Sequence, residues 1–257
     1  MVMNKFKAAG IHLLISFFII SIALAGMILI WYPSQFFKLM GGLKLIITLA
    51  SVDIILGPLL TLIVFKSGKK TLNFDLLFIV LLQSCAFAYG VYVMFQARPV
   101  FIVFNKNQFD VSAVVDITSI ELAKGRLPEF RKLSVTGPKL VSIYSPDVKN
   151  KYEYAFAMSE SDMAYRYPRL FDDYNLHRNE VVKAGRPLQD LYVDNPEYKL
   201  VVKEFVNDVK RPENDFLSLP ISSELSQMAA IVDAKTGDFI KIIDAILPAP
   251  SKAAAVK

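Results

Sequence analysis

Three long apolar runs near the start of the chain constrain its fold more than any other feature. They cover residues 11–32, 45–65 and 76–96. An α-helix rises about 1.5 Å per residue, so about 20 apolar residues cross the roughly 30 Å hydrocarbon layer of a membrane. The runs therefore predict three transmembrane helices, packed as an α-helical bundle within residues 1–97.

The first run has a second interpretation, which is a cleaved signal peptide. Lys5 and Lys7 precede it, and residues 23–25 (Ala-Leu-Ala) match the small-residue pattern of a cleavage site. The apolar run continues past that match to Ile30, however, and no polar segment precedes the match. We therefore expect the helix to be retained, with cleavage as the alternative.

The net charge of +5 is distributed unevenly along the chain. Residues 1–97 carry seven lysines, and their only acidic residues are Asp53 and Asp75. The remainder, residues 98–257, carries 22 basic and 22 acidic residues. The excess of positive charge therefore flanks the apolar runs, as it does around membrane spans, and is not the basic surface of a nucleic-acid-binding protein.

The lysines also predict an orientation. Two lysines precede the first run, and three lie between the second and third runs. The segment between the first and second runs has two, and aromatic residues gather there at positions 31–37, as they do at a membrane interface. Because positive loops stay in the cytoplasm, we expect a cytoplasmic N-terminus and a C-terminal part on the far side of the membrane.

After residue 97 the pattern changes to that of a soluble domain. Alternating apolar residues predict two strands on either side of the turn at residues 105–107, a strand over 140–144, and a hairpin over 228–246 that turns near Gly237. Short helices are expected over 117–125 and 197–209. We predict an α+β domain with antiparallel sheet over residues 98–246 and a disordered tail over 247–257.

One acidic residue lies near the middle of the second run. A carboxylate there costs about 2.5–3.5 kcal/mol, so Asp53 should face a partner and not lipid. It either pairs with a polar or cationic group of another protein's helix or, as we favour, is protonated or hydrogen-bonded to Ser51, Gln83 or Ser84 of its own bundle. Pro58 follows after about one turn and should kink the helix.

Few residues in the chain have a pattern typical of catalysis. We find no phosphate-binding loop, nucleophile elbow or zinc motif. Cys85 lies in an apolar run, and His177, in a charged segment, is the one histidine after residue 97. We interpret His12 as a solvated residue at the membrane interface. The sequence thus predicts no catalytic residue, no metal site, no cofactor and no enzymatic activity.

Four segments resemble a known family. They are GPLLTLIVFKSGKK at 57–70, FDLLFIVLLQ at 74–83, AYGVYVMFQARPVFIVF at 88–104 and DAKTG at 233–237. In this order they resemble the type IV pilin accessory proteins (TfpX/TfpZ-like, also called FimB-like). The resemblance implies an inner-membrane accessory protein or chaperone with a periplasmic domain, which stabilises type IV pilin and promotes or modulates pilus assembly.

The resemblance also implies partners. These are the major pilin subunit, inner-membrane lipid and other pilus assembly proteins. It assigns no contact residues, so the candidates for contact with a client helix come from the polar and kinked positions of the spans: Asp53, Gly57, Pro58, Gln83 and Tyr89.

Two other classes of function stay open as alternatives. An envelope enzyme, such as a lipid or glycan transferase, would need polar and acidic residues at the outer interface, whereas Asp53 lies deeper. A membrane-anchored binding module or sensor would be expected to have a cytoplasmic output domain, and the segments predicted to be cytoplasmic are short.

Overall fold

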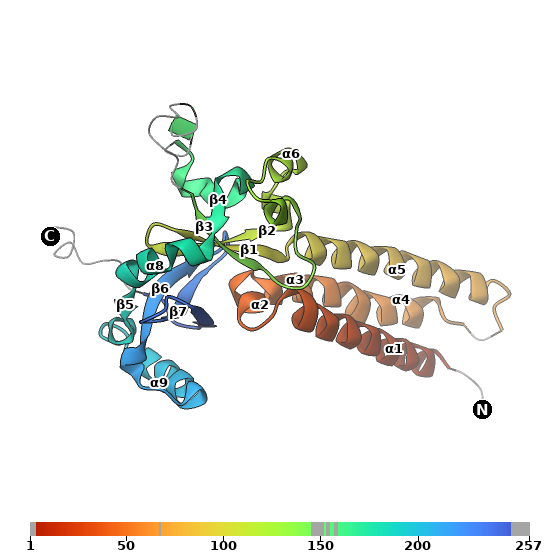
Figure 1. The fold of residues 1–257 in the computed structure, drawn as a ribbon. Helices are drawn as coiled ribbons and strands as arrows, with labels where there is room; N and C mark the ends of the chain where they lie inside the picture. The colour runs from red at the N-terminus through yellow and green to blue at the C-terminus, as the bar shows by residue number, and fades with distance from the viewer. Residues whose placement is uncertain (1–3, 67, 145–151, 153–154, 157–158, 248–257) are drawn as a thin grey trace. The chain divides into compact units, whose positions relative to one another are not determined.

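The computed structural model describes residues 4–66, 68–144, 152, 155–156 and 159–247 (Figure 1). Contacts between residues divide the chain into two compact units. The first, the helical unit, comprises residues 1–31 and 41–97; the second, the sheet unit, comprises residues 32–40 and 98–257.

Two helices of the helical unit are long and apolar enough to cross a membrane. The first is α1, Lys5–Gly26, which continues as the π-helical turn η1, Met27–Trp31. The second is α5, Leu72–Gln96. Only 17% of the most apolar stretch of the first helix and 11% of that of the second are buried. Such helices leave most of their apolar surface to lipid or to other helices, which is why they differ from the core helices of soluble proteins.

The second apolar run forms a helical path in three pieces. They are α3, Gly42–Ser51, the π-helical turn η2, Val52–Leu56, and α4, Gly57–Val64. Of this path, the described part from Asp53 to Val64 is an apolar helix shorter than a membrane span. Among the described residues, then, two helices meet the criterion for a span, and the third span remains a prediction.

The short segment between the first two apolar runs folds with the sheet unit. It contains the helix α2, Phe36–Leu39. Tyr32 and Leu39 are fully buried. The backbone carbonyl of Leu39 accepts hydrogen bonds from the hydroxyls of Ser223 and Ser226, at 2.7 and 3.0 Å. These contacts make residues 32–40 an integral part of the sheet unit.

The sheet unit is built on one eight-stranded sheet. Its strands are β1 Pro99–Asn105, β2 Gln108–Ala113, β3 Lys139–Ile143, β4 Phe171–Asp173, β5 Arg186–Pro187, β6 Phe216–Ser222, β7 Gln227–Asp233 and β8 Phe239–Ile243. The order is β4-β3-β1-β2-β6-β7-β8, and β5 pairs with β6 outside this path.

The prediction of an antiparallel sheet is wrong, because the sheet is mixed. The hairpins β1–β2 and β6–β7–β8 are antiparallel, but β1 pairs with β3 and β2 with β6 in parallel. Antiparallel neighbours can be joined by a tight turn, whereas parallel neighbours need a long crossover. The long stretches before β3 and before β6 allow such crossovers.

Helices and helical turns fill the connections of the sheet unit. They are η3 Val114–Asp116, α6 Ser119–Ala123, η4 Pro128–Arg131, η5 Ser161–Arg166, η6 Pro168–Leu170, η7 Tyr174–His177, α8 Arg178–Ala184, η8 Leu188–Leu191, α9 Tyr198–Val209 and η9 Glu213–Asp215. The amphipathic helix predicted over 197–209 is confirmed as α9, which buries Val202 and Phe205 against the sheet. The helix predicted over 117–125 is confirmed as the shorter α6.

Both predicted hairpins are present. In the first, the left-handed residue of the turn is Lys106, with φ of 60°, and not one of the asparagines beside it. In the second, Gly237 has φ of 69°, and a Cβ on it would lie 2.6 Å from the carbonyl oxygen of Arg178. Glycine is therefore required there on two grounds, backbone conformation and space. The predicted tail lies outside the described residues beyond Leu247.

Candidate functional site

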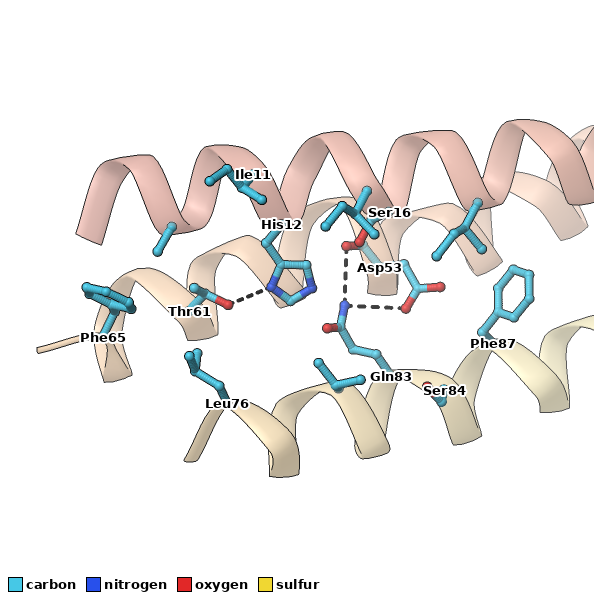
Figure 2. Close-up of a pocket in the computed structure, with 14 residues that line it drawn as sticks. Ile11, His12, Ser16, Asp53, Thr61, Phe65, Leu76, Gln83, Ser84 and Phe87 are labelled. Atoms are coloured by element: carbon cyan, nitrogen blue, oxygen red, sulfur yellow. Dashed lines mark hydrogen bonds between the residues drawn. The ribbon is translucent and has the colours of Figure 1, made fainter. Parts of the chain in front are cut away.

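The helical unit contains a cavity of about 410 Å³ between α1 and α5, with η2 and α4 on a third side (Figure 2). Most of its wall is apolar. Its polar side chains come from all three sides of the cavity: His12, Ser16, Asp53, Thr61, Gln83 and Ser84. This concentration of polar groups among apolar helices makes it the candidate site, because polar side chains are costly in a membrane and are kept where they have a role.

Asp53 and Gln83 form the centre of the site. Both are buried, with 5% and 9% of their surface exposed. The amide nitrogen Nε2 of Gln83 lies 3.4 Å from the backbone carbonyl of Asp53 and 3.5 Å from its carboxylate oxygen Oδ1. These hydrogen bonds are at the long end of the range and are correspondingly weak. Asp53 therefore has a partner within its own bundle, which agrees with the interpretation favoured from the sequence.

The backbone around Asp53 is set by Pro58. A π-helical turn bonds each carbonyl to the amide five residues later, which for Asp53 would be residue 58. Proline has no N–H to offer. The carbonyl of Asp53 thus lacks a donor in that register and accepts from Gln83 instead. The π turn η2 ends one residue before the Gly57–Pro58 pair, and π turns often occur at functional sites.

Gly57 makes the space that Gln83 occupies. A Cβ on Gly57 would lie 2.0 Å from Nε2 of Gln83, closer than any non-bonded contact allows. Only glycine at this position lets the amide of Gln83 reach Asp53. The structure thus brings together Asp53, Gly57 and Gln83, three of the five residues proposed from the sequence.

The other two proposed residues lie differently. Pro58 is half-buried at the start of α4. Tyr89 is 69% exposed on α5 and does not line the cavity. Contact of any of the five with a client helix remains a prediction.

The sequence interpretation missed a second polar pair. Nδ1 of His12 lies 2.6 Å from the hydroxyl of Thr61, so His12 has a partner inside the helical unit. Thr61 is 2% exposed. A threonine in an apolar helix gives little sequence signal, because its hydroxyl can bond to its own backbone. The signal for this pair in the sequence was limited to Thr61 itself, a polar residue about one turn after Pro58.

One acceptor at this site is unsatisfied. Among the described residues, the buried oxygen Oε1 of Gln83 has no hydrogen-bond partner. A buried acceptor without a donor costs about 1–3 kcal/mol, and more when water is excluded. Together with the carboxylate of Asp53, it makes the cavity rich in acceptors. The arrangement suits the binding of a group that donates hydrogen bonds.

The sheet unit has its own polar cluster around His177. Nε2 of His177 lies 3.2 Å from Asp172, and Nδ1 lies 3.4 Å from Glu180. Arg126 approaches the same Asp172 at 3.9 Å. The contact between His177 and Asp172 joins η7 to the edge strand β4. Within the part of the chain that the structure describes, no group of three or more His, Cys, Asp or Glu side chains is arranged to hold a metal ion.

Comparison with known proteins gives a consistent result. The chain is 33% identical to the fimbrial assembly protein of serogroup E1 from Dichelobacter nodosus over 228 residues, which is 86% of this chain and 87% of that protein. The chain belongs to this fimbrial assembly protein family. The resemblance to type IV pilin accessory proteins is thereby confirmed.

Two further fimbrial assembly proteins of Dichelobacter nodosus match as well. That of serogroup I is 33% identical over 73% of this chain and 74% of its own length. That of serogroups C1 and C2 is 38% identical over 45% of this chain and 90% of its own length. No family model and no solved structure matches the chain.

Proposed function

We propose that this protein is an inner-membrane accessory protein that stabilises the type IV pilin subunit and promotes its assembly into pili. The observation that carries the proposal is the similarity to fimbrial assembly proteins, which extends over 86% of the chain and so covers both units. The apolar helices of the helical unit support a membrane location.

The fold of the sheet unit supports a three-span topology. Residues 32–40 and 98–247 pack into one unit, so they lie on the same side of a membrane. If α5 crosses the membrane, the chain between residues 41 and 97 must cross a second time to rejoin that unit. The helical path of residues 42–64 has 23 residues. At about 1.5 Å per residue it reaches about 34 Å, enough for that crossing.

The charges support an exported sheet unit. The lysine-rich loop between α4 and α5 and the basic N-terminus favour the cytoplasm, which leaves residues 32–40 and the neutral C-terminal part in the periplasm. In this arrangement the helical unit is beside the transmembrane helix of a pilin subunit, and the sheet unit is on the same side as the pilin head. Inner-membrane lipid and other assembly proteins are the remaining partners in this proposal.

The proposal assigns no enzymatic activity. Among the described residues, the polar side chains of the cavity include the pairs His12–Thr61 and Gln83–Asp53, and the histidine of the sheet unit contacts two carboxylates. We propose that these groups shape surfaces for binding and take no part in chemistry.

Deletion of the gene in the native host tests the function. We expect fewer pili on the cell surface and less pilin in the membrane, and recovery of both when the wild-type gene is restored. Unchanged piliation together with an unchanged level of pilin would overturn the proposal.

A further inference from the structure

The cavity of the helical unit has the form of a groove lined by two helices. From α1 it is lined by residues 8, 11–12, 15–16 and 19, and from α5 by residues 76, 80, 83–84 and 87. Both sets follow the i, i+3/i+4 spacing of one helix face. Each set covers eleven residue steps, which is about 17 Å of helix. Figure 2 shows α1 and α5 on opposite sides with their side chains between them.

The helices around the groove suit a helical occupant. α1 and α5 each contact α4, which closes the third side, and a fourth helix between α1 and α5 would complete a four-helix arrangement. Small side chains, such as those of Ala8, Ser16 and Ser84, lie along both walls. Small residues let helices approach closely in a membrane, where packing and hydrogen bonds hold helices together.

The polar groups of the groove specify what the occupant must carry. Oε1 of Gln83 is buried and unpartnered among the described residues, and the carboxylate of Asp53 accepts only a long bond from Gln83. Both are acceptors at the same level of the groove. An apolar acyl chain would leave them unsatisfied, whereas a helix with a hydroxyl, amide or ammonium group at this level would satisfy them.

We propose that the groove between α1 and α5 binds the transmembrane helix of the pilin subunit, and that this helix places a hydrogen-bond donor at the level of Gln83 and Asp53. The inference rests on the proposed function, which supplies pilin as the client. It assigns the client contact to the facing stripes of α1 and α5, and not to Tyr89, which is exposed elsewhere on α5.

Site-specific photocrosslinking in living cells tests the groove. A photoreactive residue replaces Ile15 or Val80, which line the groove, or in matched controls their neighbours Leu14 and Leu81. The controls are 69% and 59% exposed and do not line it. We expect crosslinks to pilin from Ile15 and Val80, and little from Leu14 and Leu81. Equal yields from both pairs, crosslinks only to a second copy or to lipid, or none to pilin would overturn the inference.

Filling the groove provides a second test. Ile15→Trp and Val80→Trp should lower surface piliation at normal abundance in the membrane, whereas Leu14→Trp and Leu81→Trp should not. Gln83→Leu, which removes the acceptor, should reduce the pilin crosslink from Val80 by about threefold to tenfold. Normal piliation and crosslinking in all these variants would overturn the groove inference alone, because the proposed function fails only if deletion of the gene leaves pilin and pili unchanged.

Discussion

Gln83 occupies the space that any side chain at position 57 would take: a Cβ on Gly57 would lie 2.0 Å from Nε2 of Gln83. The two residues lie on different helices, α4 and α5. Their contact places the amide of Gln83 against Asp53 and shapes the middle of the groove. Glycine at position 57 therefore allows the polar site to form, because the absence of a side chain leaves space for the amide of Gln83.

Replacement of Gly57 by alanine should consequently loosen the helical unit. Alanine normally stabilises a helix relative to glycine by about 1 kcal/mol. In Gly57→Ala the new methyl group instead displaces Gln83 and leaves the buried acceptors of Asp53 without this donor, at a cost of about 1–3 kcal/mol, so we expect a lower midpoint of thermal unfolding for the full chain in detergent. Gly26→Ala is the matched control, because a Cβ on Gly26 meets nothing within 4 Å and should not lower the midpoint.

A double variant isolates the cause. In Gly57→Ala/Gln83→Ala the collision is absent, so this variant should unfold at a higher temperature than the sum of the two single changes indicates. Strict additivity would show that the effect of Gly57→Ala does not act through Gln83.

The topology makes a labelling prediction. In a Cys85→Ser background, single cysteines at Lys38 and Lys235 should react with a membrane-impermeant maleimide added to intact spheroplasts. A cysteine at Lys69 should react only after the membrane is permeabilised. Labelling of positions 38 and 235 from opposite sides would contradict the single sheet unit that both residues belong to.

The turn of the C-terminal hairpin predicts sensitivity to acid. Burial alone would raise the pKa of Asp233, but backbone N–H groups of Thr236 and Lys235 and the guanidinium of Arg211 together lower its pKa to about 2. The pKa of Asp233 is thus lower in the folded state than in the unfolded state, where it is near 3.9. The ionised carboxylate therefore stabilises the fold above about pH 3.9, and this stabilisation is lost as the pH falls toward 2.

Asp233→Ala should therefore destabilise the sheet unit at pH 7 and have a smaller effect near pH 2. We expect a loss of about 1–2 kcal/mol, since solvent screens the 40% exposed Arg211. The loss of stability is measured by urea unfolding of the full chain, with the resistance of the sheet unit to protease as the readout. An equal loss at both pH values would assign the effect to packing and not to charge.

A buried carboxyl in β2 predicts the opposite pH dependence. Burial raises the pKa of Asp110 to about 6, against the hydrogen bonds from Gln108 and Asn105. Its oxygen Oδ2 has no partner among the described residues. Because the folded state binds the proton more tightly than the unfolded state, the stability of the fold decreases as the pH rises from about 4 to about 6.

Asp110→Asn removes this titration while keeping an oxygen for Gln108. We expect the variant to be more stable than the wild type at pH 7, by about 1–3 kcal/mol, and closer to it at pH 4. The same urea and protease assay at the two pH values compares them. A variant less stable than the wild type at pH 7 would mean that the charge of Asp110 is compensated in the folded state.

Local patterns in the sequence predicted local structure well. The alternation on either side of Lys106 and Gly237 gave the two hairpins, and the spacing of apolar residues gave α9. These elements depend on neighbouring residues alone. The first and third apolar runs likewise form α1 with η1 and α5, as their length and composition predicted.

Long-range pairing was beyond the same reasoning. The mixed sheet depends on β2 meeting β6 more than a hundred positions later, and β6, which contains Pro220, was not predicted. Residues 32–40 were expected to be only a loop, whereas two serine hydroxyls bind the carbonyl of Leu39. Within the site, Asp53 stood out as a charge among apolar residues, but its pairing with Gln83 and that of His12 with Thr61 required the arrangement of the helices.

Recovery of pilin with the protein from membranes tests the central claim most directly. The full chain, tagged and purified in mild detergent from cells that make pili, should carry the pilin subunit with it. Leu81→Trp should retain the pilin and Val80→Trp should lose most of it, with the three proteins equally abundant. Absence of pilin from the wild-type preparation, although pilin is plentiful in the same membranes, would contradict the account.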